Sequence, residues 1–433
     1  MLLQRIFLVG VCACFMLPVW ADKLPSTQEI SLSISTTSVQ KMDSSLPLFI
    51  EKVWAESPVV KAAQSAIKAA LAREEGTDQP LYNPNLVLDA ESSEINTAVI
   101  GFNQTLDWSD QRDAQRQMAH KQVLMAQAEL RQVKQKVAVE TLSALAEYVT
   151  AQQMQALGLQ RGELIQNFID MVKKRQLAGD MGALEGMLAQ VTYSEVLMQQ
   201  AAIDSQLAEA EAALQSVTGL VLKQWPSLPS ELASPPENVQ YELLKKLPEL
   251  SVLIRRMEAA KSRVLVMDRA TSMAPTIGVR AGQEGSETLV GVSLEIPLFV
   301  RNDFKAEVRA LSYEVVMEEQ AYQAAYRRAK ARFDGSLGRY KNTSRAWNVW
   351  LTQGQTAHRE QIVLLERIWQ ASELTATDYL IQAKQSIETE KAAMVLMGEV
   401  WQAVIAWLNA SGQVADWLGI SPIESKNVTR FGE

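Results

Sequence analysis

The chain has 433 residues, of which 47% are hydrophobic and 21% charged, and this balance excludes a disordered polymer. Its formal net charge of −8 argues against a nucleic-acid-binding protein, which normally carries an excess of basic residues. Only 20 Gly and 14 Pro interrupt the chain, which favours long helices over a β-sandwich or a doubly wound sheet. We therefore expect a mostly α fold and no nucleic-acid partner.

The N-terminus has the features of a secretory signal peptide over residues 1–21. A basic residue precedes an apolar run that ends at Pro18, and a small-residue cleavage signal ends at Ala21. A retained membrane anchor is the alternative, although the run is shorter than the ~20 residues of a membrane-spanning helix. Both cysteines, Cys12 and Cys14, lie in this segment, so cleavage removes thiol chemistry, whereas lipidation of Cys14 is a further alternative. No later run predicts a transmembrane helix, so a membrane location would require a closed β-barrel.

An internal repeat with an offset of about 190 residues organises the rest of the chain. Pro58 aligns with Pro248, and the segment YNPNLVLDAES from Tyr82 aligns with MAPTIGVRAGQ from Met273. Each unit predicts a helix, two strands with alternating apolar and polar residues, a very long helix, a turn and a second helix.

The two predicted repeats are flanked by less regular segments. The first repeat, 48–218, comprises a helix over 48–77, strands 85–92 and 97–106, a long helix 111–178 and a helix 182–217. The second repeat, 241–411, comprises a helix, strands 276–283 and 288–297, a long helix 303–370 and a helix 376–410. An N-terminal extension covers 22–47, a Pro-rich linker 219–240 and a C-terminal segment 412–433.

The predicted elements are incomplete as a single copy. A helix of roughly 68 residues is about 100 Å long, which is too long for a compact core, and the near-heptad apolar spacing over 380–408 predicts coiled-coil packing. Four strands are fewer than the roughly eight that a closed membrane barrel needs. Three copies supply twelve strands and twelve helical columns that enclose a tunnel, whereas two copies leave little room inside the barrel.

Three kinds of local feature accompany the repeat. They are Asn83-Pro84-Asn85 before the first strand, Ile296-Pro297-Leu298-Phe299 at the end of the fourth, and the turns with Gly179-Asp180 and Glu373 to Tyr379. In the repeat and in these features the chain resembles the TolC-type outer-membrane factors, the outer membrane efflux proteins of bacteria. The chain looks most similar to the cobalt-zinc-cadmium (heavy-metal) efflux branch. This resemblance implies a homotrimer with an α-barrel in the periplasm and a twelve-stranded β-barrel in outer-membrane lipid, four strands per protomer. It also implies a periplasmic adaptor and an inner-membrane pump of the resistance-nodulation-division class as partners.

The resemblance places the two helical turns at periplasmic tips that contact the adaptor and narrow the pore. The tip residues are Leu177, Gly179, Asp180, Leu374 and Thr375. Four acids near the turns could form rings of carboxylates that attract cations, namely Asp180, Glu185, Glu373 and Asp378. The alternative is that Asp180 and Asp378 only cap the short helices.

Trp108 and Phe299 follow the second and fourth predicted strands, where aromatic residues would meet the lipid–water boundary, although local packing is an alternative. The two histidines, His120 and His358, lie alone on separate predicted helices and are expected at the surface, so they predict no metal site. No phosphate loop, zincin motif or nucleophile elbow is present, and we expect neither a cofactor nor an enzyme.

The sequence therefore predicts a passive channel subunit of a tripartite efflux system, located in the outer membrane and extending into the periplasm. Heavy-metal cations are the expected cargo. The alternatives are a drug or other small-molecule efflux or type I secretion channel of the same family, and a periplasmic coiled-coil adaptor without a pore.

Overall fold

The computed structural model describes residues 45–179, 181–229, 232–371 and 373–420. The predicted signal peptide, nearly all of the N-terminal extension, Asp180 and the end of the C-terminal segment lie outside the described residues. The described chain is mostly helical with one small antiparallel sheet, which confirms the predicted fold class.

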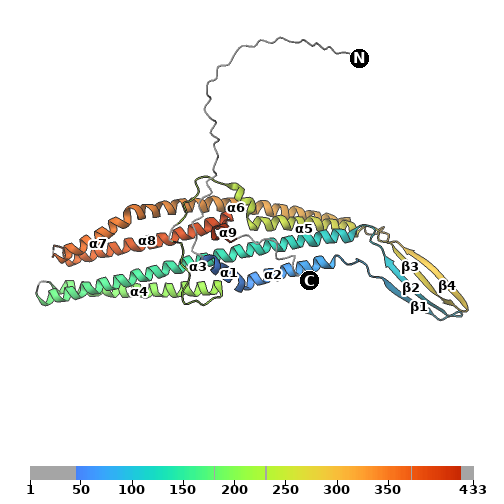
Figure 1. Cartoon of the computed structure of the whole chain (residues 1–433), viewed down its shortest axis with the longest axis horizontal. Coiled ribbons are helices and arrows are strands. Elements are labelled where there is room, and N and C mark those ends of the chain that lie inside the picture. The colour runs from blue at the N-terminus through green and yellow to red at the C-terminus, as the bar shows by residue number, and fades with distance from the viewer. Residues whose placement is uncertain (1–44, 180, 230–231, 372, 421–433) are drawn as a thin grey trace, which may run out of the picture. The chain divides into compact units, whose positions relative to one another are not determined.

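The same order of elements occurs twice along the chain (Figure 1). The first set is α1 (Ser45–Glu56), α2 (Pro58–Gly76), β1 (Asn85–Glu91), β2 (Thr97–Thr105), α3 (Gln111–Leu177) and α4 (Ala183–Thr218). The second set is the 3₁₀ helix η1 (Tyr241–Lys246), α5 (Pro248–Ala270), β3 (Thr276–Glu284), β4 (Glu287–Glu295), α6 (Lys305–Val349), η2 (Trp350–Gly354), α7 (Gln355–Gln370) and α8 (Ala376–Ser411), followed by α9 (Val414–Leu418).

Two predicted helices are divided in the structure. The helix expected over 48–77 is two helices, α1 and α2, because Pro58 lacks the N–H that would continue the hydrogen-bond ladder and instead occupies the first turn of α2. The helix expected over 303–370 is interrupted by η2, one turn of π-helix, before it continues as α7. Gly354 ends this turn, and the ring of Trp350 lies only 2.5 Å from where a Cβ at Gly354 would be. The prediction of one uninterrupted helix was therefore wrong in the second repeat.

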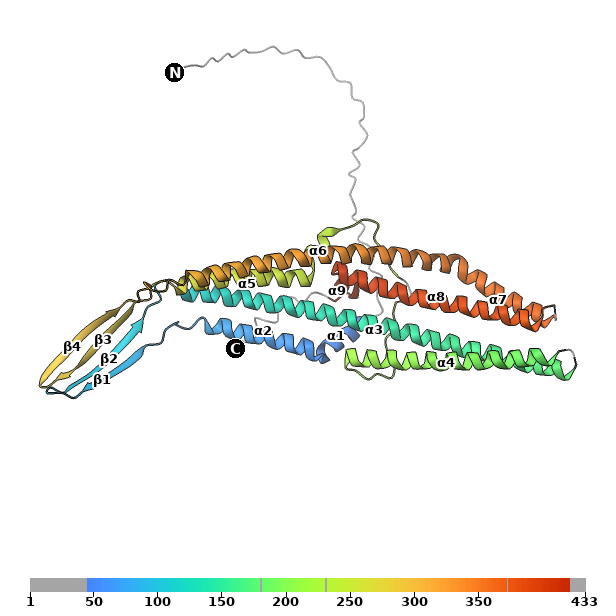
Figure 2. The same cartoon turned by 180° about the vertical axis from the view of Figure 1, so that it is seen from behind.

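The helices pack side by side in the way that the predicted lengths require. α3 contacts α2 along one part of its length and α4 along another, while α6 and α7 are accompanied by α5 and α8 (Figures 1 and 2). Contacts of α3 with both α5 and α8 join the two repeats. Each long column is therefore lined by two shorter helices.

A central apolar core lies where the shorter helices meet. It combines Ile50 of α1, Leu142 of α3, Phe333 of α6 and Trp407 of α8, and Trp225 of the linker packs into it. The ring of Phe333 meets that of Trp407 edge-on, with 4.7 Å between centroids. Segments far apart in sequence thus share one core, which fixes the two repeats to each other.

Helix α8 is long and apolar enough to cross a membrane, the one such helix within the described residues, so the sequence expectation of no such run was wrong. Its Trp401, Val404 and Leu408 belong to the central core, and α8 packs against α3 and α6. Within the protein, 44% of its apolar window is buried.

The four strands form one antiparallel sheet in the order β1-β2-β3-β4. β2 of the first repeat pairs with β3 of the second along its whole length, from Thr97 opposite Glu284 to Thr105 opposite Thr276. β1 and β4 are the two outer strands (Figure 1). The sheet is therefore built by both repeats together.

Candidate membrane sheet and helical tips

One face of the sheet is apolar across all four strands. Leu86, Phe102, Val279 and Val292 form one row across the strands, and Leu88, Ile100, Ala281 and Val290 form the next. The large apolar side chains of this face are exposed, and Val292 is the most exposed of them at 81%. Side chains alternate between the two faces of a strand, so the register places both rows on the same face. Gln104, Gln283 and Thr288 lie on this face too, toward the ends of the strands.

The opposite face of the sheet carries mostly polar residues and glycines, together with Val87, Val99 and Leu289. Gly101, Arg280 and Gly291 are neighbours in one row, and Asn103, Gly278 and Ser293 in the next. Arg280 is the one basic residue in the four strands. A sheet with one apolar and one polar face suits a wall between lipid and water.

The strand-to-helix junctions are fixed by side-chain caps that the sequence analysis missed. The carboxylate of Asp107 accepts hydrogen bonds of 2.9 Å from the backbone N–H groups of Gln111 and Arg112 at the start of α3. Asp110 and Phe304, the residues before α3 and α6, both have left-handed backbones, with φ of 54° and 52°. Non-glycine residues seldom adopt this conformation, and its occurrence once per repeat marks equivalent corners between strand and helix.

The two aromatic residues predicted at the membrane interface lie beside these corners. Trp108 is 76% exposed. Phe299 is half-buried and packs edge-on against Phe304, with ring centroids 5.9 Å apart. The local packing alternative thus applies to Phe299, while Trp108 has an exposed ring.

The first helical turn joins α3 to α4. Gly179 has a φ of +80°, which allows the sharp reversal after α3, and Leu177 is 90% exposed. Gly182 precedes α4, and Glu185 lies in the first turn of that helix. Asp180 lies outside the described residues, so neither a cap nor a pore-facing role is tested for it. An exposed apolar residue at the tip of a turn is a candidate contact for another protein.

The second helical turn joins α7 to α8 and shows a different cap from the predicted one. Thr375 is the N-cap, and its Oγ1 accepts a hydrogen bond of 3.1 Å from the backbone N–H of Asp378. The Thr375 hydroxyl in turn donates to the Asp378 carboxylate at 2.6 Å. Thr375 is therefore the N-cap, and Asp378 is the third residue of helix α8 (position N3). Glu373, Thr375 and Asp378 are exposed, whereas Leu374 is half-buried and packs against its neighbours.

An apolar cluster joins the two helical hairpins near these turns. Phe168 of α3, Trp369 of α7 and Tyr379 of α8 stack with ring centroids 5.0–5.3 Å apart. The guanidinium of Arg175 lies 4.6 Å from the Trp369 ring centroid. Burial raises the pKa of Tyr379 above its ordinary value. The two hairpins are thus held together by a desolvated aromatic contact.

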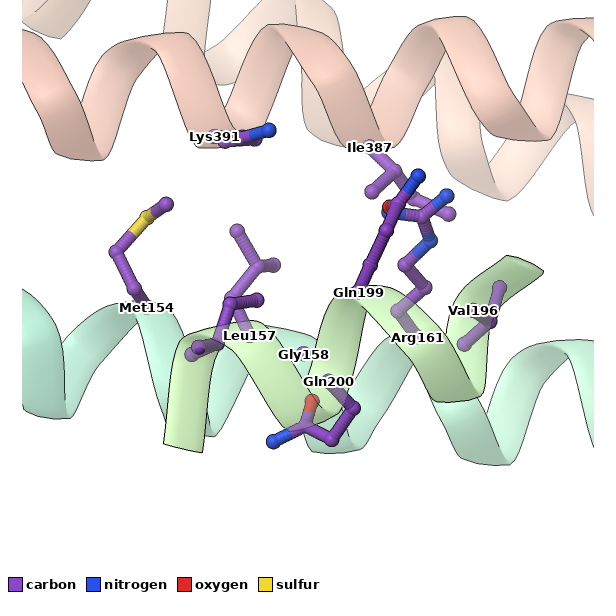
Figure 3. A pocket seen from close by; sticks show the side chains of 10 residues that line it. Met154, Leu157, Gly158, Arg161, Val196, Gln199, Gln200, Ile387 and Lys391 are labelled. Atoms are coloured by element: carbon purple, nitrogen blue, oxygen red, sulfur yellow. The ribbon is translucent and has the colours of Figure 1, made fainter. Parts of the chain in front are cut away.

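A polar contact joins α3, α4 and α8 farther from the turns (Figure 3). Arg161 is only 8% exposed; its guanidinium contacts the side-chain oxygen of Gln199 and lies 3.8 Å from Glu388. Beside it is a cavity of about 20 Å³, large enough for about one water molecule. Lys384 donates to Glu195 at 2.9 Å, and this hydrogen bond lowers the pKa of Glu195. These pairs are separated by 38 to 227 residues in sequence, so periodicity could not reveal them.

The histidines do not form a metal site in the described part of the chain, where no group of three metal-ligating side chains occurs. His120 is exposed and its Nδ1 lies 2.8 Å from Glu74. His358, expected at the surface, is buried, and its Nε2 lies 2.9 Å from both the carbonyl and hydroxyl oxygens of Ser386. The expectation failed because α7 turns this face toward α8 after the π-helical turn.

The model of the outer membrane efflux protein family matches residues 49–220. This part of the chain, the first repeat, is therefore similar to the outer membrane efflux proteins. Among curated protein sequences no significant match was found. The family description agrees with the predicted outer-membrane location and with a transport role rather than an enzymatic one.

Solved outer-membrane channels share the fold of nearly the whole chain. The outer-membrane channel OprN is 14% identical, with a TM-score of 0.73 over 87% of this chain and 91% of that one. CusC, described for its transmembrane channel formation, is 14% identical with a TM-score of 0.72 over 86% and 92%. The Campylobacter jejuni CmeC outer membrane channel is 12% identical with a TM-score of 0.72 over 89% and 88%. The fold shared with these channels thus includes the second repeat as well as the first.

Proposed function

We propose that this protein is the outer-membrane channel subunit of a tripartite efflux system, a passive conduit formed by three copies. The observation that carries this proposal is the four-stranded sheet, which has one exposed, largely apolar face and two outer strands that each pair on one side only within the described residues. Such a face is costly in water, and such edges are costly in lipid unless the sheet closes.

Three copies are the smallest number that closes this sheet around an open lumen. Each copy contributes four strands, so three contribute twelve. The polar face then lines the inside of the barrel, and the paired helical columns of each copy continue it as an α-barrel. The fold shared with OprN, CusC and CmeC supports this assembly.

The helical tips are the proposed contact with a periplasmic adaptor, which in turn connects to a pump of the resistance-nodulation-division class in the inner membrane. The exposed Leu177 supports this proposal, together with the exposed Thr375 at the second turn. Leu177→Asp is expected to abolish adaptor-dependent export while leaving the trimer intact. Loss of the trimer itself would assign Leu177 to assembly instead.

Heavy-metal cations are the proposed cargo, on the ground that Glu373 and Asp378 are exposed acids at the α7–α8 turn and three copies would multiply each. Glu373→Gln with Asp378→Asn is expected to lower the cation preference of single channels in planar bilayers. Glu209→Gln, an exposed acid far along α4, is the matched control and should leave selectivity unchanged. Equal selectivity in all three proteins would contradict a role for the tip acids.

Sensitivity of cells tests the cargo directly. Cells that lack this chain should become sensitive to cobalt, zinc or cadmium salts. Sensitivity to organic compounds alone would favour the drug or small-molecule channel of the same family.

The assembly test uses purified protein. Extraction from membranes should require detergent, and the extracted protein should sediment as a trimer and conduct ions when reconstituted. Recovery as a soluble periplasmic monomer would contradict the channel and favour the adaptor alternative.

A further inference from the structure

The two outermost helices beside the sheet, α2 and α6, each have a side that faces away from the rest of the copy. Within the described residues α2 packs on α3, whereas α6 packs on α5 and α8, and α3 joins the two halves. Figures 1 and 2 show α2 and α6 at opposite margins of the helical part. Both adjoin an open strand edge, because α2 precedes β1 and α6 follows β4. Given the trimer of the proposed function, closure of the sheet brings α6 of one copy beside α2 of the partner subunit.

α6 exposes large apolar side chains on its outward side. Val315 and Tyr322, seven residues apart and thus on one side of the helix, are half-buried, and Tyr322 packs against the central core. Tyr313 and Met317 are each two residues from Val315, which places them about 200° around the helix from it. Their side chains are 73% and 60% exposed, and Val316 beside them is 50% exposed. A contiguous apolar patch of this kind marks a surface that another molecule covers.

α2 carries small side chains on its own outward side. Ile67 and Ala70 are buried against Val123 and Ala126 of α3. Residues two positions away lie about 200° around the helix, and the exposed residues on that side are Ala62, Ser65, Ala69 and Ala72. A row of Ala and Ser lets a second helix approach closely, because the distance between packed helix axes depends on the side chains at the contact. The small row of α2 thus complements the large side chains of α6 in size.

An equivalent contact already occurs once inside the copy. Pro58 aligns with Pro248 in the repeat, so α2 is equivalent to α5, and α3 is equivalent to α6. α3 packs on α5, with Lys121 of α3 3.7 Å from Glu258 of α5. The repeat equivalent of that packing is α6 against α2. One copy cannot form it, because α3 and α5 lie between these two helices, so the partner subunit supplies α2.

The ion pair between α3 and α5 also sets the height of this contact. Its two residues are equivalent to Val315 of α6 and Lys68 of α2, counted from the left-handed corners before α3 and α6 and from the aligned prolines. Those positions are therefore level to within about one turn of helix, or about 5.4 Å. Met317 is then level with the stretch 65–72 of the partner subunit, which carries the row of small side chains.

We propose that Tyr313 and Met317 of α6 pack into the row of small side chains on α2 of the partner subunit, three times around the α-barrel beside the sheet. This contact is heterologous, since it joins two different faces, and heterologous contacts close into rings. A contact of α6 with α6 would be isologous, would end at a dimer and would leave the row on α2 uncovered. The match in size therefore favours a ring over a pair of copies.

Cysteine cross-linking in membranes tests which faces meet. Met317→Cys is combined in one chain with Ser65→Cys, Ala69→Cys or Ala72→Cys, and at least one combination should give covalent trimers on oxidation, whereas each cysteine alone should give none. Glu319→Cys with Ala69→Cys is the matched control and should give none, because Glu319 is exposed but lies about 200° around α6 from Met317. No cross-link in any of the three combinations in a protein that remains trimeric, or an equal yield in the control, overturns the proposal.

Exchange of side-chain size tests the fit in the full-length channel. Ala69→Trp fills the row and should lower the temperature at which the detergent-solubilised trimer dissociates. Addition of Met317→Ala makes room and should regain at least half of the loss. Gln64→Trp, at an exposed position on another side of α2, is the control and should dissociate at the wild-type temperature. An Ala69→Trp trimer as stable as the wild type, no gain from Met317→Ala, or an equal loss in the control refutes the fit.

Failure of this contact and failure of the proposed function give different results. A wild-type trimer that conducts ions, in variants that show neither the cross-link nor the effect of size, contradicts only the contact between α6 and α2. A wild-type protein that is monomeric in membranes contradicts the trimer itself and the proposed function with it.

Discussion

Replacement of Val292 by arginine tests whether the exposed apolar face of the sheet meets lipid. Val292 lies in the row of Leu86, Phe102 and Val279, away from both ends of β4, and its side chain is 81% exposed in one copy. In the proposed barrel this position faces lipid. Ser293, the next residue, faces the polar interior and is the matched control.

The expected cost of Val292→Arg is large because the proposed trimer would present the substitution three times. An arginine on the lipid face near the bilayer midplane costs about 2–4 kcal/mol per copy, or about 6–12 kcal/mol for three copies. The net stability of folded proteins is about 5–15 kcal/mol, so assembly in the membrane should largely fail. Ser293→Arg places the same charge in water and should cost little.

Recovery of trimer from outer-membrane fractions, measured by gel mobility without heating, checks this prediction. Val292→Arg should leave little trimer, and Ser293→Arg should leave an amount close to that of the unaltered protein. Equal recovery of the two variants would refute the assignment of the faces. A larger loss for Ser293→Arg would mean that the polar face meets lipid.

Three further predictions concern the helical tips. Thr375→Ala removes the cap of α8 and should cost about 1 kcal/mol, seen as a lower unfolding temperature by circular dichroism; an unchanged temperature would contradict the cap. Trp369→Ala removes the ring between the two hairpins and should cost about 3–5 kcal/mol, whereas Trp108→Ala, at an exposed site, should change helix melting little. The pKa of Glu195 is lowered first of all by the hydrogen bond from Lys384, so its stabilisation is complete above the ordinary value of 4.5 and is lost as the pH falls through the lowered pKa. Lys384→Met should remove this acid-side dependence of the unfolding temperature, and an unaltered pH profile would show that the pair does not contribute.

Local patterns in the sequence were sufficient for the repeat, the strand faces and the approximate helix positions. Alternating residues in β2 and β4 assign each side chain to a face wherever the strand lies, because the strand period is two. The interruptions of the helices were predicted less well from the sequence. Pro58 signals the division between α1 and α2, yet the π-helical turn at Trp350 depends on how that ring lies against Gly354.

The candidate site was predicted in part. The positions of the two turns agree with the sequence analysis. The adaptor contact of Leu177 and the membrane-interface position of Trp108 stay predictions; both side chains are exposed. The identity of the α8 cap was wrong, because threonine and aspartate are both good caps and only the backbone bond to Thr375 distinguishes them.

Length, helix content and a two-faced sheet that is incomplete in one copy were determined by the sequence itself, since each depends on periodicity over neighbouring residues. The tertiary structure alone decided which distant residues meet: His358 beneath Ser386, Arg161 beside Gln199, and Arg280 across Gly291. These contacts depend on how helices rotate and strands register against each other, which the packing of the whole chain sets and no single segment encodes.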